Sequence, residues 1–253
     1  MSDQARAGRR GVVAPAILTL IMVAVLIALG IWQIERKAWK EGLIDTLTQR
    51  LSAPPSDLPP PARWAELNQA EDEYRHVRFT AALVPGEDAL IFTSGSTFRP
   101  DVEGPGYWVL APARLAGGAT VVVNRGFLPN GEPDPAARDR GSSGAPVEMV
   151  GVMRWPEPSA WFTPASEPSR NLWFVRDQLA IAKAKNWGEV APFFVELESP
   201  RPPEGLPIPG SLKATLPNDH LQYAIVWFSL AAVVAASFGF WLRGRLREQR
   251  AGE

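Results

Sequence analysis

The stretch VVAPAILTLIMVAVLIALGIW, residues 12–32, contains no charged side chain. A second stretch of the same kind, LQYAIVWFSLAAVVAASFGFWL, fills residues 221–242. At about 1.5 Å of rise per residue, each stretch forms a helix of about 30 Å, which matches the hydrocarbon thickness of a bilayer. The core helix of a soluble protein seldom runs so far without a charge. The two stretches therefore predict two transmembrane helices.

Arginine residues flank both predicted spans on the side of the chain ends. The residues concerned are Arg6, Arg9 and Arg10 before the first span and Arg243, Arg245, Arg247 and Arg250 after the second. Because cytoplasmic flanks are enriched in Lys and Arg, we expect the tails 1–11 and 243–253 to be cytoplasmic. The first apolar run exceeds the roughly 7–15 residues of a cleavable signal peptide, so we expect it to be retained as an anchor.

Residues 33–220 are then expected on the far side of the membrane, which is the periplasm for a bacterial inner (plasma) membrane protein. This segment carries 19 Lys and Arg against 24 Asp and Glu, a net charge of −5. The acidic balance argues against nucleic acid as a partner. The chain has no cysteine and only two histidines, which excludes disulfides and thiolate metal sites. No catalytic triad or HExxH spacing is present, so we do not expect an enzyme.

The exported segment has the patterns of a β-rich domain. Within residues 75–84, apolar side chains alternate with polar ones, as in a half-buried strand. The apolar positions are Val77, Phe79, Ala81 and Leu83, and further strands are predicted at 89–93, 107–110, 119–124, 147–154 and 193–198. Loops rich in Pro and Gly, including 130–146, separate them. The predicted fold is an α+β membrane protein whose two transmembrane helices flank a small antiparallel sheet or barrel.

Two helices are expected to frame this sheet. The first span continues as an amphipathic helix that Pro54 and Pro55 end. Its apolar residues recur every four positions at Trp39, Leu43, Leu47 and Leu51. A second, short helix begins near Asp177, whose carboxylate suits an N-terminal turn, and ends before Gly188.

Several motifs follow one another in an order that resembles the Surfeit locus protein 1 family. The motifs are LGIWQIERKAWKEGLI at 29–44, GYWVLAPARLAGG at 106–118, VVVNRGFLP at 121–129, NLWFVRDQLA at 171–180 and NDHLQYAIVWF at 218–228. They cover most of the chain, and the first, third and last are the most specific. Two spans around a β-rich exported domain are also that family's layout.

The resemblance implies a chaperone-like assembly factor for cytochrome c oxidase and related haem–copper terminal oxidases of respiratory chains. Bacterial members are thought to bind haem a and to present it to the catalytic subunit of the oxidase. The histidine of their last motif, proposed as the haem ligand, corresponds to His220. Neutral imidazole is a common axial ligand of haem iron, and the outer end of a span offers lipid for the isoprenoid tail of haem a and water for its propionates.

Other residues are candidates for the same site. His220, Tyr223 and Trp227 lie at i, i+3 and i+7, so we expect an aromatic stripe beside the ligand. The alternative is that the two aromatic residues pack on the first helix, near Trp32 and Gln33, while Asn218 and His220 cap the second helix.

Two residues outside that motif are also considered. Arg125 could pair with a haem propionate through its fork of donors, or lie solvated in a strand-end turn. His76 is expected to be a solvated or hydrogen-bonded residue of a strand and not a ligand.

Two functions of different kinds therefore stay open. The protein is either a haem a carrier that acts on an oxidase subunit or a cofactor-free membrane scaffold that stabilises that subunit during assembly. The sequence does not determine which oxidase is served, the stoichiometry of haem, a second axial ligand or the oligomeric state.

Overall fold

The computed structural model describes residues 3–96, 98–131, 144–203, 205–214 and 216–251. Part of the loop predicted at 130–146 thus lies outside the described residues. The chain separates into two compact units. Residues up to Ile44 and from Pro217 onward form the helical unit, and Asp45–Leu216 form the sheet domain.

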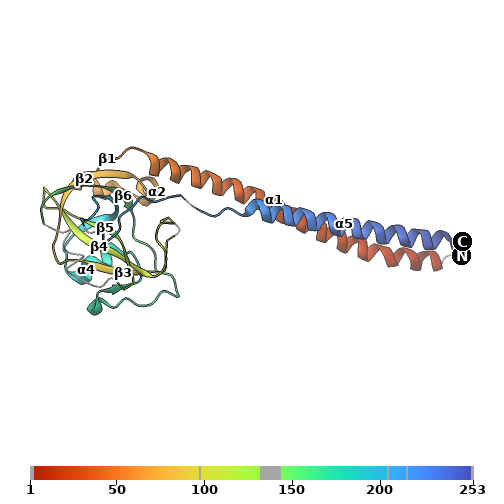
Figure 1. The fold of residues 1–253 in the computed structure, drawn as a ribbon. Helices are drawn as coiled ribbons and strands as arrows, with labels where there is room; N and C mark the ends of the chain where they lie inside the picture. Colours follow the sequence, from red (N-terminus) through yellow and green to blue (C-terminus); the bar gives the residue numbers. More distant parts are fainter. Residues whose placement is uncertain (1–2, 97, 132–143, 204, 215, 252–253) are drawn as a thin grey trace. The chain divides into compact units, whose positions relative to one another are not determined.

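Two long helices make up the helical unit, α1 (Asp3–Ser52) and α5 (His220–Ala251) (Figure 1). Both are long and apolar enough to cross a membrane. Their apolar side chains point outward, as shown by Leu20 at 71% and Val233 at 60% exposure. A surface of this kind is stable in lipid and not in water. The predicted end of the first helix before Pro54 is confirmed.

The two helices run in opposite directions, because Gly30 faces Phe228 and, one turn further along α1, Gln33 faces His220. A Cβ at Gly30 would lie 2.5 Å from the Phe228 ring, so glycine is needed for this close approach. Buried and half-buried residues recur along each helix at alternating spacings of three and four. On α5 this seam comprises His220, Ala224, Trp227, Ala231, Val234 and Phe238.

The amphipathic face predicted for residues 39–51 is only partly correct. Leu47 is buried and Leu51 half-buried, but Trp39 and Leu43 are 56% and 40% exposed. A spacing of four residues advances by about 40° beyond a full helical turn. Over twelve residues the four side chains therefore drift about 120° around the helix and cannot share one face.

The sheet domain contains one eight-stranded sheet (Figure 1). Its strands are β1 (Ser56–Asp57), β2 (His76–Leu83), β3 (Ala89–Thr93), β4 (Gly106–Leu115), β5 (Thr120–Pro129), β6 (Val147–Arg154), β7 (Leu172–Trp173) and β8 (Val190–Ser199). The order is β1-β2-β6-β8-β5-β4-β3-β7. The short helical segments are η1 (Pro61–Glu66), α2 (Gln69–Asp72), η2 (Pro168–Arg170) and α4 (Gln178–Lys185).

The sheet is mixed, so the prediction of an antiparallel sheet is correct only in part. The pairs β5–β8, β1–β2 and β3–β7 are parallel. Parallel neighbours need long connections, which short-range patterns do not reveal. In addition, β2 pairs with β4 at Ala81–Leu83, so the strands β2, β6, β8, β5 and β4 form a ring of hydrogen-bonded neighbours.

The six predicted strands are present, and those at 89–93 and 147–154 have the predicted bounds. The predicted buried face of β2 is confirmed, since Val77, Phe79, Ala81 and Leu83 are all buried. The two-residue strands β1 and β7 are too short to produce a pattern. The short helix α4 is also as predicted, because Asp177 Oδ1 accepts hydrogen bonds from the N–H groups of Leu179 and Ala180.

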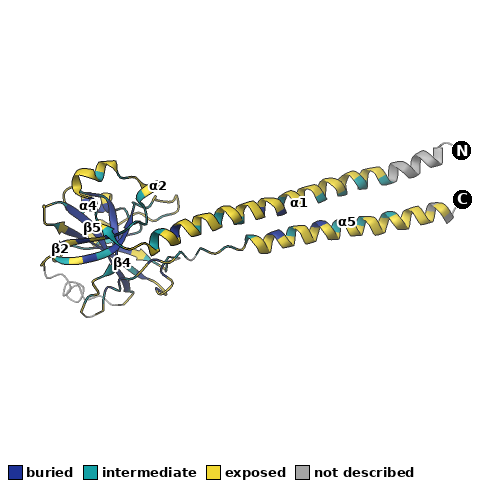
Figure 2. Cartoon of the chain, turned by 90° about the horizontal axis from the view of Figure 1, so that it is seen from above, coloured by how far each residue is buried: buried dark blue, intermediate teal, exposed yellow. Residues whose placement is uncertain are grey.

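Two apolar cores lie on opposite faces of the central strands. Val121 and Val123 of β5 belong to the first core, whereas Val122 belongs to the second. Phe193 and Phe194 of β8 divide in the same way. Figure 2 shows the buried residues gathered in the strands. Because these strands are covered on both faces, a polar residue such as Glu196 of β8 is buried as well.

Candidate functional site

His220 is the first residue of α5 and is half-buried on the seam with α1. Its Nδ1 lies 2.7 Å from Gln33 Oε1. An amide oxygen only accepts hydrogen bonds, so Nδ1 carries the proton and donates it. Among the described residues nothing forms a hydrogen bond with Nε2, which therefore presents its lone pair. This is the tautomer and orientation in which histidine ligates a metal ion.

Gln33 follows the charge-free stretch of α1 directly and is only 9% exposed. A hydrogen bond at such a site is strong because little water competes for it, and the buried amide would lose free energy without its partner. Gln33 thus fixes the imidazole ring. The sequence patterns did not identify it as the partner of His220. The available signal was that both polar residues stand at matching ends of two antiparallel apolar helices.

The two aromatic residues of the predicted stripe, Tyr223 and Trp227, point in different directions. Trp227 is half-buried on the seam with His220, beside Ala224 and Ala231. Tyr223 is 55% exposed, because three helical residues turn the side chain about 60° away from His220. Tyr223 therefore flanks the seam and faces outward. Trp32, near which the alternative interpretation placed both rings, is itself 52% exposed.

The residues just before α5 add two further contacts. Lys40 Nζ donates a hydrogen bond to the carbonyl oxygen of Pro217, which ties this segment to α1. Asn218 Oδ1 is buried and has no hydrogen-bond partner among the described residues. A buried acceptor without a donor costs free energy.

Arg125 belongs to the sheet domain, whereas His220 belongs to the helical unit. It lies within β5 and is 5% exposed. The expected strand-end turn with a solvated arginine is wrong, because β5 continues to Pro129. Gly126 takes φ +126°, and a Cβ there would lie 2.2 Å from the carbonyl oxygen of Ile208. The bend is therefore a close crossing of two segments and not a strand end.

Both ring nitrogens of His76 are engaged. Nδ1 lies 2.9 Å from the carbonyl oxygen of Ala53, and Nε2 lies 2.8 Å from Glu198 Oε2. Neither nitrogen is left for a metal ion in this arrangement, which agrees with the expectation that His76 is hydrogen-bonded.

A buried network of charged residues joins the end of β6, the interior strand β8 and the segment after β7. Arg176 Nη1 lies 3.1 Å from Glu196 Oε2, and Arg154 Nη1 lies 3.7 Å from the same oxygen. Arg176 also pairs with Glu157, and Arg154 with Glu73. Burial alone would raise the pKa of the Glu157 carboxyl, but the guanidinium groups of Arg176 and Arg154 hold that pKa below its usual range.

Aromatic rings enclose the two arginines of this network. The Arg154 guanidinium lies 4.9 Å from the ring centre of Tyr74, and that of Arg176 lies 5.6 Å from Trp108. Such contacts stabilise a desolvated cation. The sequence patterns did not reveal the network, although Glu196 between the apolar residues Val195 and Leu197 was a signal for a buried charge. Because its charges are paired internally, we interpret the network as structural.

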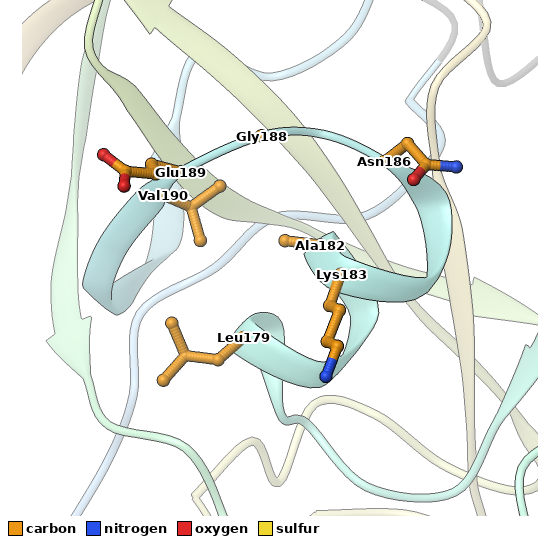
Figure 3. Close-up of a pocket in the computed structure, with 7 residues that line it drawn as sticks. All are labelled: Leu179, Ala182, Lys183, Asn186, Gly188, Glu189 and Val190. Carbon is orange, nitrogen blue, oxygen red and sulfur yellow. The ribbon is translucent and has the colours of Figure 1, made fainter.

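A surface hollow of about 640 Å³ lies beside α4 (Figure 3). Leu179 and Val190 line it together with Lys183 and Glu189, which carry opposite charges. None of the predicted site residues contributes to it. Among the described residues no group of three or more His, Asp or Glu could hold a metal ion. Haem iron differs from such an ion in needing only one or two axial ligands from the protein.

Comparison with known proteins shows which family the chain belongs to. The model of the SURF1 family matches residues 20–232. The chain belongs to the SURF1 family. It is 33% identical over 242 residues to Surfeit locus protein 1 of Homo sapiens, covering 91% of this chain and 77% of the human protein. It is 32% identical over 238 residues to Surfeit locus protein 1 of Rattus norvegicus, covering 90% and 74%.

A SURF1-like protein of Monosiga brevicollis is also similar, with 32% identity over 232 residues, 88% of this chain and 86% of that protein. The range matched by the SURF1 family model includes Gln33, Arg125 and His220. It therefore includes the candidate ligand, the residue that orients it and the candidate propionate partner.

Proposed function

We propose that this protein assists the assembly of a haem–copper terminal oxidase in a bacterial plasma membrane, by binding haem a and passing it to the catalytic subunit. The SURF1 family is known for cytochrome oxidase assembly factors. The observation that carries the haem-binding part is the hydrogen bond between His220 and Gln33, which orients the imidazole and leaves Nε2 open.

The residues around His220 fit a haem. His220 would supply an axial nitrogen ligand, and Trp227 and Tyr223 would supply apolar surface. Because Asn218 Oδ1 is buried, it could accept a hydrogen bond from the hydroxyl group of haem a only after the segment before α5 had moved. When bound, the haem supplies the iron centre of the oxidase, and the chain itself performs no chemistry on it. Its residues bind, orient and shield the group.

Arg125 as a propionate partner stays part of the proposal, with one condition. Because its side chain is 5% exposed, it would have to leave its buried position to meet a ligand that is not already inside the sheet domain. Removing a buried charge from its surroundings is costly, so the contact would depend on a change in the sheet domain.

A cofactor-free scaffold is the second candidate, and the same hydrogen bond gives it some support. A buried Gln33–His220 pair joins the two helices and fixes their register without any ligand. In that case Nε2 of His220 would have no function of its own.

The optical spectrum of the protein purified from cells that make haem a tests the proposal. We expect haem a in the wild type and a loss of most of it in His220→Ala, with membrane insertion unchanged, because a polar residue at the end of a span contributes little to insertion. His76→Ala is the matched control and should keep its haem. Equal haem content in wild type and His220→Ala would favour the cofactor-free scaffold.

A further inference from the structure

Two lysines continue the seam of α1 beyond Gln33, toward the C-terminal end of that helix. Between Gln33 and Ile44 the only half-buried positions are Lys37 and Lys40, and all the others are exposed. The side chain of Lys37 is only 28% exposed. Lys37 and Lys40, called the lysine pair below, therefore lie on the same face of α1 as the residue that orients the imidazole.

Contacts within the helical unit place the lysine pair beside His220. Gln33 bonds to His220, and seven residues further along α1 Lys40 Nζ donates to the carbonyl oxygen of Pro217, three residues before His220. At 1.5 Å of rise per residue, Lys37 and Lys40 lie about 6 and about 10.5 Å beyond Gln33 along the helix axis. The pair thus lies just outside the imidazole, past the end of the charge-free stretch of α1.

The two ammonium groups can both meet an anion. Lys37 Nζ pairs with Glu41 Oε1 at 2.5 Å, but that glutamate side chain is 49% exposed, and pairs of this kind contribute little to stability. Another carboxylate can therefore take its place. Among the described residues Lys40 Nζ bonds only to the neutral carbonyl oxygen of Pro217, which leaves its charge without a counter-charge there.

Basic residues at the end of a span can also act only as anchors at the membrane surface. Arg36 has that character, because it is exposed and its guanidinium lies 3.9 Å from the ring centre of Trp39. The lysine pair differs, since both residues are half-buried on the seam. In the proposed orientation the pair also lies on the exported flank, where Lys and Arg are infrequent. A specific anion explains this position better than anchoring does.

The carboxylates of a haem are the anions that fit this position. A haem carries two propionates at one edge of its ring, away from the iron. Two lysines match their charge, and the long flexible side chains can adapt to them. Such pairs are stronger at the edge of a bilayer than in bulk water, because the dielectric constant is lower there. Arg125, by contrast, is 5% exposed and would first have to leave its buried position.

We propose that Lys37 and Lys40 form the subsite for the two propionates of the haem whose iron His220 ligates. The inference rests on the haem binding proposed above, and it names the residues that orient the ring about the bond between iron and imidazole. The phosphate of an anionic lipid has related chemistry and could occupy the same lysines, so it forms one arm of the test.

A comparison of haem a with its dimethyl ester, in which both carboxylates are uncharged, tests the subsite. Both ligands are titrated into the haem-free full-length protein in phosphatidylcholine nanodiscs and followed by the Soret band. We expect wild type to bind haem a about tenfold more tightly than the ester. Lys37→Gln and Lys40→Gln should each lower that ratio about threefold, and the double variant should bring it near one. The Soret maximum should stay that of wild type, because His220 is intact.

Arg36→Gln is the matched control, because it removes the same charge one residue away and should keep the wild-type ratio. The ratio also separates the subsite from a structural role, since loss of the contact between Lys40 and Pro217 would weaken both ligands alike. A ratio near one in wild type, or an equal fall in Arg36→Gln and Lys37→Gln, would overturn the proposal. So would loss of the difference between wild type and the double variant when phosphatidylglycerol is added to the nanodiscs, because the lysines would then hold lipid phosphate.

A failure of the proposed function gives a different result. If His220→Ala binds haem a as tightly as wild type does, ligation by His220 is wrong, and the subsite defined by that ligation is wrong with it. If His220→Ala loses haem a while wild type binds haem a and the ester equally, only the lysine subsite is wrong.

Discussion

At the scale of single residues, Gln33 decides how His220 is presented. Gln33→Leu removes the acceptor for Nδ1–H, so the imidazole ring and its tautomer are no longer fixed. We expect haem affinity to fall by about 10- to 100-fold, the usual cost of losing such a support. Gln33→Glu keeps an acceptor and should retain most binding, with a shifted Soret band because the imidazole becomes more electron-rich. Identical spectra and haem content in all three proteins would show that Gln33 does not act through His220.

Gly126 is a second residue with a defined role, at the close crossing of β5 and the segment around Ile208. Its φ is +126°, and a Cβ there would lie 2.2 Å from the carbonyl oxygen of Ile208, so no side chain fits. Gly126→Ala should lower the free energy of unfolding of the sheet domain by at least about 2 kcal/mol. Gly117→Ala is the control, because no atom lies within 4 Å of a Cβ there. Chemical unfolding of the detergent-purified protein measures both, and equal effects would contradict the close crossing.

Sequence patterns predicted the burial of several individual residues, but not the contacts between residues that are far apart in the chain. His220 and the buried face of β2 follow from motif and alternation. The partner of His220 is 187 residues away in the chain. The close crossing at Gly126 was missed for a similar reason, since the segment around Ile208 is also remote in the chain. Contacts between distant segments follow from tertiary packing, which local periodicity does not encode.

At the scale of elements, the buried charges connect the segment after β7 to the neighbouring strands β6 and β8. Glu196 of β8 pairs with arginines that follow β7 and end β6. Glu196→Gln leaves two buried guanidinium groups without their shared carboxylate. We expect a loss of about 3–5 kcal/mol in the free energy of unfolding. Glu167→Gln, which breaks an exposed pair with Arg170, should change it by less than about 0.5 kcal/mol. Similar losses in both variants would refute the network's role.

The same network predicts how stability depends on pH. The pKa of Glu157 is lowered in the fold by Arg176 and Arg154, against the effect of burial. Its contribution is therefore complete above the unfolded value of about 4.3 and is lost as pH falls through the lower, folded value. We expect the midpoint temperature of unfolding of the sheet domain to fall when the pH is lowered below about 4. The fall should be smaller in Glu157→Gln. A midpoint in that variant that changes with pH as in wild type would contradict this assignment.

The elements themselves were easier to predict than their pairing. Proline residues and alternation located the end of α1 and six strands, because these signals are local. The parallel pairs and the ring from β2 to β4 depend on connections that carry no pattern of their own. The drift of Trp39 and Leu43 from the buried face shows that a four-residue repeat is not a helical repeat over several turns.

At the scale of the whole molecule, the membrane topology is the first prediction. Both tails are expected in the cytoplasm and the sheet domain outside it, because arginines flank the spans at the chain ends. Ser2→Cys and Gly244→Cys in intact cells should resist a membrane-impermeant maleimide, whereas Gly117→Cys should react once the reagent has passed any outer membrane. The chain has no other cysteine to react. Labelling of Gly244→Cys in intact cells would reverse the orientation.

The last prediction separates a carrier from an enzyme and from a scaffold. If the protein carries haem a, as proposed, it performs no step of haem synthesis. A deletion strain should keep haem a in its membranes, lose part of its oxidase activity and accumulate oxidase subunits without that haem. Weak complementation by His220→Ala would tie the defect to ligation only if Gln33→Leu, which breaks the same hydrogen bond between the helices but keeps the imidazole, complements better. Full rescue by His220→Ala would indicate a scaffold, and a deletion strain without any haem a would indicate a biosynthetic enzyme.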